Sequence, residues 1–301
     1  KFLLVVFCVF PSLALANPLE RRITSLNREG VGPEWNVQTS EFPQIFKNLT
    51  VQGSLRMART KPIESVHPYD QEDGRSVDRP ALIDDLFYES LFLTDPLGLT
   101  ENRYPLIARA IRLAEDKSYA VFEIDPRARF QDGTPVLGSD VLASIEILKS
   151  SSALAKARIE GAVRGFSANN NEVRVEFKAE KSAVISALLL LASTKVVKQN
   201  TVGATSVGGI RVRFTATGPY RLAQLGKSRL SLIIDPSYWG RNLGVRRGFF
   251  NLRAIDVVAF PDEAAARMSV ADESANFLME KQPAAVALTH QILKAKNEGI
   301  V

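Results

Sequence analysis

Few side chains in this chain of 301 residues could support acid–base or metal chemistry. It has two histidines, His67 and His290, and neither has a carboxylate or cysteine partner at a metal-ligand spacing. The acid pairs Asp84-Asp85 and Glu115-Asp116 are adjacent in sequence. Because neighbouring residues on a helix or strand point apart, neither pair predicts a catalytic carboxylate dyad. The sequence therefore predicts no metal site and no acid–base pair.

Nucleophilic catalysis and nucleotide binding also lack a candidate. The one cysteine, Cys8, lies in an N-terminal segment that we expect to be removed, and no Gly-Xaa-Ser-Xaa-Gly elbow is present. The glycines at 203, 208 and 209 do not form a phosphate-binding loop. We therefore expect a protein that is not an enzyme and uses no cofactor. An exported hydrolase is the weakest of the functions considered.

The composition is that of an ordinary globular protein, with 46% hydrophobic and 24% charged residues. The formal net charge is +5, but apart from the pairs at 21–22 and 246–247 the basic residues are scattered. Nucleic-acid binding would need a basic stripe, so we expect no nucleic-acid partner. A solvated surface explains the charge better than an anionic ligand or a membrane surface does.

The N-terminus has the pattern of a cleavable signal peptide. An unbroken apolar run over residues 2–10 is followed by Ala14-Leu15-Ala16, the small-residue pattern of signal-peptidase sites. The run is too short for a bilayer, which needs about 20 residues. We expect residues 1–16 to be removed, the mature chain to be periplasmic and thiol-free, and residues 17–50 to form an extended leader docking through Phe42 and Phe46.

Hydrophobic periodicity predicts a mixture of strands and helices. Alternation predicts strands over 53–60, 119–125, 172–179 and 210–215. Helical spacing predicts helices over 80–92 and 183–192, and a third that begins after Ser139 or Asp140, either of which could cap it. Residues 61–78 read as a loop. The irregular order favours an α/β or α+β lobe with a mixed, twisted sheet.

Two turns are also predicted. Asp132-Gly133 supplies a tight turn between the strand over 119–125 and the third helix, because glycine tolerates positive φ. Residues 169–171, all asparagine, predict a hairpin turn before Val173. Tyr220, Tyr238 and Trp239 follow turns, and we interpret their rings as structural rather than ligand-stacking.

Several of these segments together resemble a known family. Arg129-Phe-Gln-Asp-Gly-Thr-Pro-Val136 and the Ser-Asp-Val that follows resemble a motif of the family 5 extracellular solute-binding proteins of ABC importers, the oligopeptide, dipeptide and nickel class. Residues 86–92 are similar to the family's Tyr-Asp/Glu-Ser-Leu stretch, and residues 217–222 with 230–240 to its second signature. Residues 241–251 resemble the Yej-type subgroup, associated with peptides and microcin C.

The resemblance implies a type II periplasmic-binding-protein fold of which the second lobe is largely missing. It implies a first lobe over 51–280, with an inserted subdomain at about 80–195, and a start of the inter-lobe crossing or a truncated tail over 281–301. Glu273 stands where the family has glycine, and Asn276 where it has aspartate.

The resemblance also places a ligand cleft beside the loop after residue 59 and beside the segment before Tyr220. The residues that it implies as ligand contacts are Thr60, Lys61, Glu64, Ser65, His67, Tyr69, Thr215 and Thr217. For His67, the sequence favours a solvated loop histidine over a ligand contact.

Two functions follow. The first is the extracytoplasmic component of an ABC importer, which captures short peptides and delivers them to the transporter's membrane permease subunits, its only link to the membrane. The alternative is a truncated or decayed solute-binding protein that is retained as a non-transport interaction protein.

Overall fold

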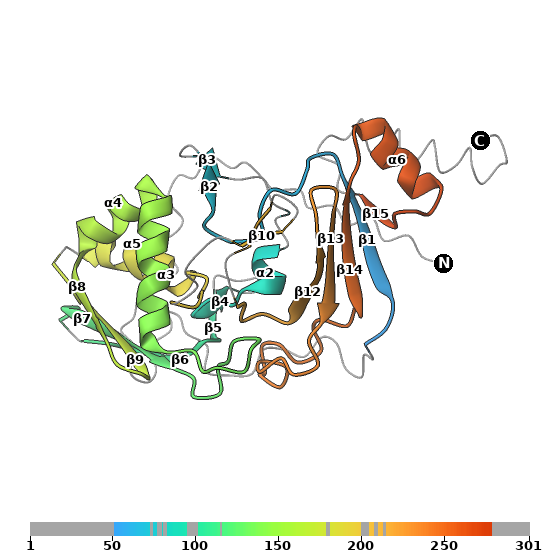
Figure 1. The fold of residues 1–301 in the computed structure, drawn as a ribbon. Helices are drawn as coiled ribbons and strands as arrows, with labels where there is room; N and C mark the ends of the chain where they lie inside the picture. Colours follow the sequence, from blue (N-terminus) through green and yellow to red (C-terminus); the bar gives the residue numbers. More distant parts are fainter. Residues whose placement is uncertain are drawn as a thin grey trace.

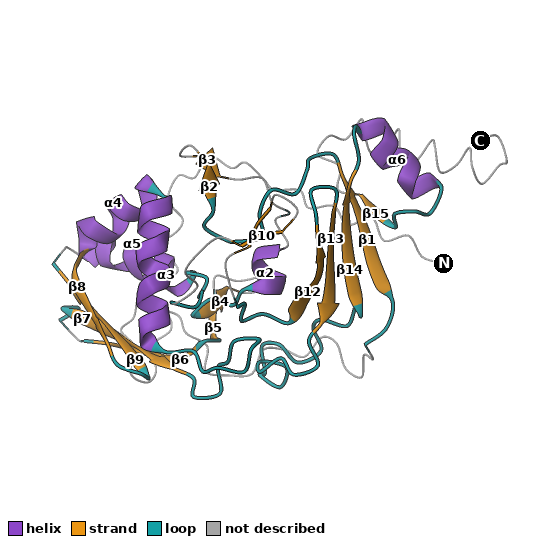
Figure 2. Cartoon of the chain, viewed as in Figure 1, coloured by secondary structure: helices purple, strands orange, loops and turns teal. Residues whose placement is uncertain are grey.

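The computed structural model describes residues 51–72, 75–76, 80, 83–94, 102–114, 116–178, 181–199, 205–207, 210–212 and 215–278. The expected signal peptide, the leader over 17–50, the tail over 281–301 and His290 lie outside these residues. Two sheets organise the described part, one on each side of Figure 1. Figure 2 shows three helices over one of them, and α2 (Ile83–Phe87) and α6 (Glu263–Ala271) beside the other.

The first sheet has five strands drawn from both ends of the described chain. Its order is β12 (Tyr220–Leu225), β13 (Arg229–Ile234), β14 (Ala254–Ala259), β1 (Ser54–Arg59) and β15 (Phe277–Leu278). β1 runs parallel to β14 and β15, whereas β12, β13 and β14 are antiparallel to one another. The helix α6 (Glu263–Ala271) joins β14 to β15 and packs Ala266 and Val270 on Ala58.

The second sheet is antiparallel, in the order β6 (Ala108–Leu113), β7 (Tyr119–Ile124), β9 (Glu172–Phe177) and β8 (Val163–Ala168). The helices α3 (Gly138–Ser151), α4 (Ala153–Ala162) and α5 (Lys181–Ala192) cover one face of it (Figure 1). Alternation along β9 buries Val173, Val175 and Phe177 against these helices. The other residues of β9 point to the uncovered face, which explains the pattern read from the sequence.

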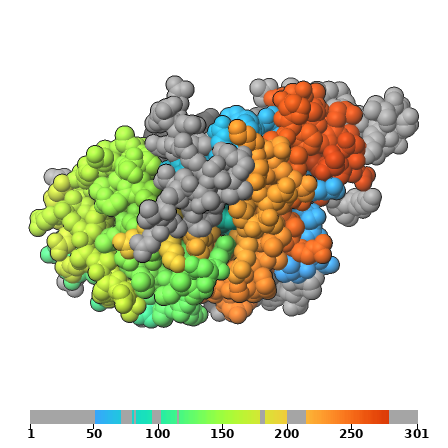
Figure 3. All heavy atoms as spheres, viewed as in Figure 1, coloured from blue at the N-terminus to red at the C-terminus, as the bar shows by residue number. Residues whose placement is uncertain are grey.

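Short elements lie between the two sheets. They are α2 (Ile83–Phe87) and three two-stranded antiparallel pairs: β2 (Gln71–Glu72) with β3 (Arg75–Ser76), β4 (Phe92–Thr94) with β5 (Arg103–Pro105), and β10 (Thr205–Val207) with β11 (Ile210–Val212). The four-stranded sheet and its helices thus fall between β1 and β12 in sequence, and the two parts abut in the space-filling view (Figure 3). The domain boundaries expected at about 80 and 195 stay predictions.

Most of the local structure predicted from the sequence is confirmed. Strands occupy the ranges expected at β1, β7 and β9 to within two residues, β11 covers the first half of the range expected over 210–215, and α5 occupies the expected apolar run. The hairpin between β8 and β9 is closed by Asn169, whose Oδ1 accepts the N–H groups of Asn171 and Glu172 at 2.8 Å each. Among the described helices, none is long and apolar enough to cross a membrane.

Two expectations about helices are wrong. The helix expected over 80–92 ends at Phe87, because the carbonyls of Phe87 and Glu89 accept tertiary hydrogen bonds from Gly218 and Val196 instead of helical ones. The third helix begins at Gly138 with Leu137 as N-cap. Ser139 does not cap it, and Asp140 acts from the first turn by accepting the N–H of Leu137 at 2.8 Å.

The predicted turn at Asp132-Gly133 is confirmed. Gly133 has φ of 84°, and Asp132 Oδ1 accepts hydrogen bonds from the N–H and hydroxyl of Thr134. The side chain of Gln131 leaves this turn and donates to the carbonyls of Gly218 and Tyr220, at 3.1 and 2.6 Å. The motif therefore links the four-stranded part to the start of β12 by hydrogen bonds.

After α6 the chain keeps the turn that glycine makes in the resembling family, although Glu273 must adopt φ of 64°. We expect Glu273→Gly to raise the free energy of unfolding by about 0.5 kcal/mol, because relief of left-handed strain exceeds the extra entropy of glycine. Urea denaturation measures the change. Glu273→Ala is the control, since it removes the same side chain and keeps the strain. Equal stabilities for the two variants would contradict the prediction.

Candidate functional site

A buried cluster of charged residues lies where three segments that resemble the family meet, namely residues 86–92, 230–240 and 241–251. Glu89 is fully buried, and its carboxylate accepts hydrogen bonds from the Tyr238 hydroxyl and the Arg246 guanidinium. Arg246 is 5% exposed, and its guanidinium lies 5.1 Å from the centre of the Phe250 ring. A carboxylate, a guanidinium and a tyrosine hydroxyl are thus hydrogen-bonded to one another away from water. The carboxylate comes from the segment after α2, and the other two groups come from the connection between β13 and β14.

The backbone around Glu89 is held as firmly as its side chain. The N–H of Glu89 donates to Thr217 Oγ1 at 2.8 Å, and the indole N–H of Trp239 donates to the Thr217 carbonyl at 3.0 Å. Gly218 lies so close to α2 that a Cβ there would be 2.6 Å from the carbonyl oxygen of Leu86. The glycine of this motif is therefore required by close backbone approach.

The electrostatics of the cluster favour one protonation state. Burial, with the negative charge of Glu89 adding to it, raises the pKa of Tyr238 well above its ordinary value. Burial alone would lower the pKa of Arg246, but attraction to Glu89 outweighs it and raises that pKa. The tyrosine therefore stays neutral and the arginine charged, so the cluster forms a compensated ion pair.

Three of the predicted ligand contacts lie in a well-bonded loop before α2. The Ser65 hydroxyl donates to Asp70 Oδ2 at 2.6 Å and accepts the N–H of His67 at 3.0 Å. His67 Nδ1 accepts the N–H of Tyr69 at 3.2 Å and lies 3.5 Å from Asp70 Oδ1. His67 is 2% exposed, so the expectation of a solvated loop histidine is wrong. Asp70 and the ring of Tyr88, 6.2 Å away, account for its burial.

The other predicted contacts are less uniform. Thr60, Lys61 and Glu64 are exposed, Thr215 is half-buried and Thr217 is buried. The two predicted cleft segments meet on the residues that follow α2, because His67 packs on Tyr88 while Thr217 bonds to Glu89. Their roles as ligand contacts stay predictions.

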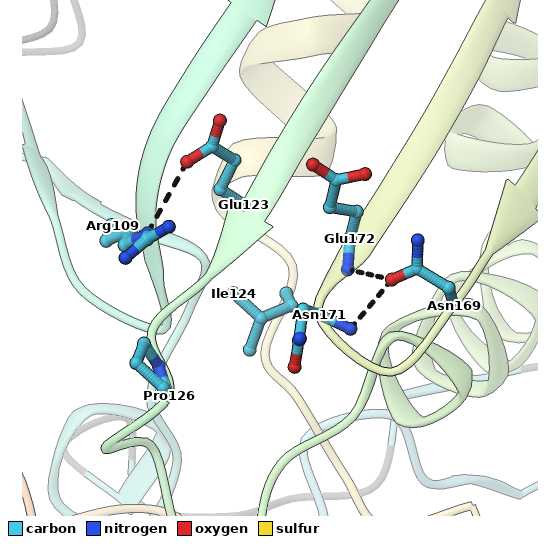
Figure 4. A pocket seen from close by; sticks show the side chains of 7 residues that line it. All are labelled: Arg109, Glu123, Ile124, Pro126, Asn169, Asn171 and Glu172. Atoms are coloured by element: carbon cyan, nitrogen blue, oxygen red, sulfur yellow. Dashed lines mark hydrogen bonds and ion pairs between the residues drawn. The ribbon is translucent and has the colours of Figure 1, made fainter.

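A polar pocket of about 300 Å³ lies at the end of the four-stranded sheet (Figure 4). Its lining residues are Arg109, Glu123, Ile124, Pro126, Asn169, Asn171 and Glu172. Glu123 and Glu172 are direct cross-strand neighbours, and Arg112 bridges them at 2.7 and 2.6 Å. Arg109 and Arg112, the second of which does not line the pocket, together balance the two glutamates, and none of the eight predicted ligand contacts lines it.

In the sequence, Glu89 and Arg246 lie within two separate motifs, and their pairing was not predicted from it. A chemical signal exists only on one side, since Glu89 is the one charged residue of the apolar and aromatic stretch 86–92, whereas Arg246 is one of three arginines in 241–251. Within the described ranges, no group of three His, Cys, Asp or Glu side chains could hold a metal ion.

The architecture resembles that of transporter-associated binding proteins of known structure. The chain aligns with the oligopeptide-binding protein AppA of Bacillus subtilis, solved with a nonapeptide, at a TM-score of 0.61 and 16% identity over 81% of this chain and 47% of that one. NikA of Staphylococcus aureus, in complex with Ni(L-His)2, aligns at 0.54 and 16% identity over 74% and 42%. These likenesses define the class by fold, a mixed α/β lobe of the type II periplasmic binding proteins, as predicted.

The family follows from the sequence match. The family model described as "Bacterial extracellular solute-binding proteins, family 5 Middle" matches residues 102–298, more than half of the chain. The chain belongs to this family, whose members are solute-binding proteins, and the resemblance stated from the motifs is confirmed.

Two curated relatives illustrate the match. The peptidoglycan-binding protein YepA of Agrobacterium fabrum is 26% identical over 260 residues, covering 82% of this chain and 40% of YepA. The uncharacterized protein YejA of Escherichia coli is 28% identical over 188 residues, covering 56% of this chain and 28% of YejA. The chain thus spans well under half the length of these relatives.

The hydrogen bonds that Lys198 and Thr134 donate to Asp132 at the Asp132-Gly133 turn should be detectable as a lowered pKa of Asp132. Burial alone would raise the pKa of Asp132, but hydrogen bonds from Lys198 and Thr134 lower it from 3.8 to about 2. Its contribution to stability is therefore complete above about pH 4 and is lost as the pH falls toward 2. We expect Lys198→Met to return the pKa toward 3.8, and to cost less than about 1 kcal/mol at pH 7 because the pair is partly exposed.

Carbon-13 NMR of the carboxyl group measures this pKa, and urea unfolding at pH 7 and pH 3 measures the stability difference, which should shrink at the lower pH. Lys149→Met, which removes the Lys149–Glu146 pair on α3, is the control and should leave Asp132 unchanged. An unaltered Asp132 pKa in the Lys198 variant would refute the assignment.

Proposed function

We propose that this chain is the peptide-capturing part of an extracytoplasmic binding protein that serves an ABC importer. The observation that carries the proposal is family 5 membership together with the fold shared with AppA, a protein solved with a bound nonapeptide. The relative named a peptidoglycan-binding protein adds support, since peptidoglycan contains short peptides. The proposed location is the periplasm, and the proposed partners are the ligand and the permease subunits of the transporter.

The geometry supports a ligand face around the residues that follow α2. The loop over residues 60–69 and the segment over 215–217 converge there from opposite sides of the sequence. Lys61 and Glu64 are exposed and charged, so they could pair with the terminal carboxylate and ammonium of a short peptide. Buried Ser65 and His67 hold the backbone of the loop, and buried Thr217 holds that of Glu89.

Calorimetric titration of the chain with pools of tripeptides tests the proposal. We expect binding heat with at least one pool, and an affinity about tenfold weaker for Lys61→Ala or Glu64→Gln, because each removes one charge-assisted hydrogen bond. Lys156→Ala, on the exposed face of α4, is the matched control and should bind as the parent does. The absence of heat with every pool would count against peptide capture and favour the non-transport interaction protein. Equal weakening by the control would count against the proposed face.

A further inference from the structure

We propose that the cluster of Glu89, Tyr238 and Arg246 is the joint that makes the two sheets one cooperative, rigid unit. Each sheet has its own apolar core. Phe122, Val173 and Leu188 lie in the core of the four-stranded part, whereas Leu230 and Ile255 lie in that of the five-stranded sheet. Separate cores can unfold separately unless something specific couples them.

The chain passes from the core of the five-stranded sheet to that of the four-stranded sheet at Glu89, and it returns at Val196 and Val197, next to Glu89. Tyr88 is buried in the core of the five-stranded sheet and Leu91 in that of the four-stranded sheet. On the return, Val196 belongs to the four-stranded core and Val197 to the other. The N–H of Val196 donates to the Glu89 carbonyl at 2.9 Å, so the two crossings are bonded to each other at this residue.

A third crossing segment brings the partners of Glu89. The connection from β13 to β14 leaves the five-stranded sheet and runs beneath the short central elements in Figure 1. Val245 of this connection packs on Tyr104 and Leu106, and Trp239 contacts both that cluster and the four-stranded core. Tyr238 and Arg246 come from the same connection, so all three crossings meet at Glu89, the second through its backbone carbonyl and the third through its carboxylate.

The chemistry of the joint makes separation costly. Losing one partner while the surrounding side chains stay packed would leave a carboxylate or a guanidinium uncompensated in an apolar surrounding, which is far less favourable than losing a neutral hydrogen bond. Other links also join the parts, and among the described residues none of those between charged groups has both partners as fully buried as Glu89 and Arg246. They include the hydrogen bonds from Gln131, that of the Tyr69 hydroxyl to the Lys195 carbonyl at 2.9 Å, and the packing of Ile147 on the five-stranded core.

Hydrogen exchange with mass spectrometry on the purified chain tests the joint without any ligand. In the parent, the slowest amides of β9 and β14 should exchange at similar rates, because both require the same global opening. In Arg246→Met, which leaves the buried Glu89 carboxylate without its guanidinium, we expect these rates to differ by about tenfold or more. Glu89→Leu with Arg246→Met replaces the ion pair by apolar side chains, and Tyr238→Phe removes one hydrogen bond and keeps the ion pair, so both should separate the rates less.

The double substitution Arg112→Met with Glu172→Gln is the control, because it removes an ion pair within one sheet. Matched rates for β9 and β14 in Arg246→Met would overturn the proposal and assign the coupling to the other links between the parts. Separation of the rates in the Arg112/Glu172 control would also overturn it. Because no peptide takes part, these outcomes are independent of whether the chain captures peptides.

Discussion

The carboxylate of Glu89 is paired with a guanidinium 157 positions later in the chain, in a place that water does not reach. A buried ion pair of this kind contributes little net stability over an apolar pair, but it tolerates few alternative arrangements. The β13–β14 connection reaches the Glu89 carboxylate, and the Thr217 segment binds the backbone N–H of the same residue, so both are positioned against the segment after α2. The arrangement of the two sheets, and of the loops between them, depends on these contacts.

The motifs that the chain shares with the resembling family therefore have structural roles. Gln131 bonds to two carbonyls at the start of β12, and Asp140 accepts both the N–H of Leu137 and that of Gln199 on the returning chain. Such bonds position segments and say nothing of a ligand. The solved structures of similar fold hold a nonapeptide in one case and a nickel–histidine complex in another, at identities of 16%. Ligand choice thus resides in residues that this scaffold carries rather than in the scaffold itself.

The parts of the fold that the sequence predicts are those decided by local periodicity and turn chemistry. The alternation of β7 and β9 and the positive φ of Gly133 need no distant partner, so they could be predicted. The end of α2 at Phe87 could not, because it is set by hydrogen bonds to Gly218 and Val196, more than 100 positions away. The burial of His67 depends in the same way on Tyr88 and Asp70 in three dimensions.

The position of β1 has a consequence for the order in which the fold can form. Ser54 pairs with Ala254, 200 positions later, and the other neighbour of β1 is the still later β15. At a synthesis rate of about 5–20 residues per second, the first strand waits roughly 10–40 s for its neighbours. Throughout that time both of its edges are open, while the antiparallel four-stranded sheet can already close from contacts nearer in sequence. A chain with this strand order cannot complete its five-stranded sheet until synthesis has passed β15, and β1 remains exposed for that time to any other strand that it meets.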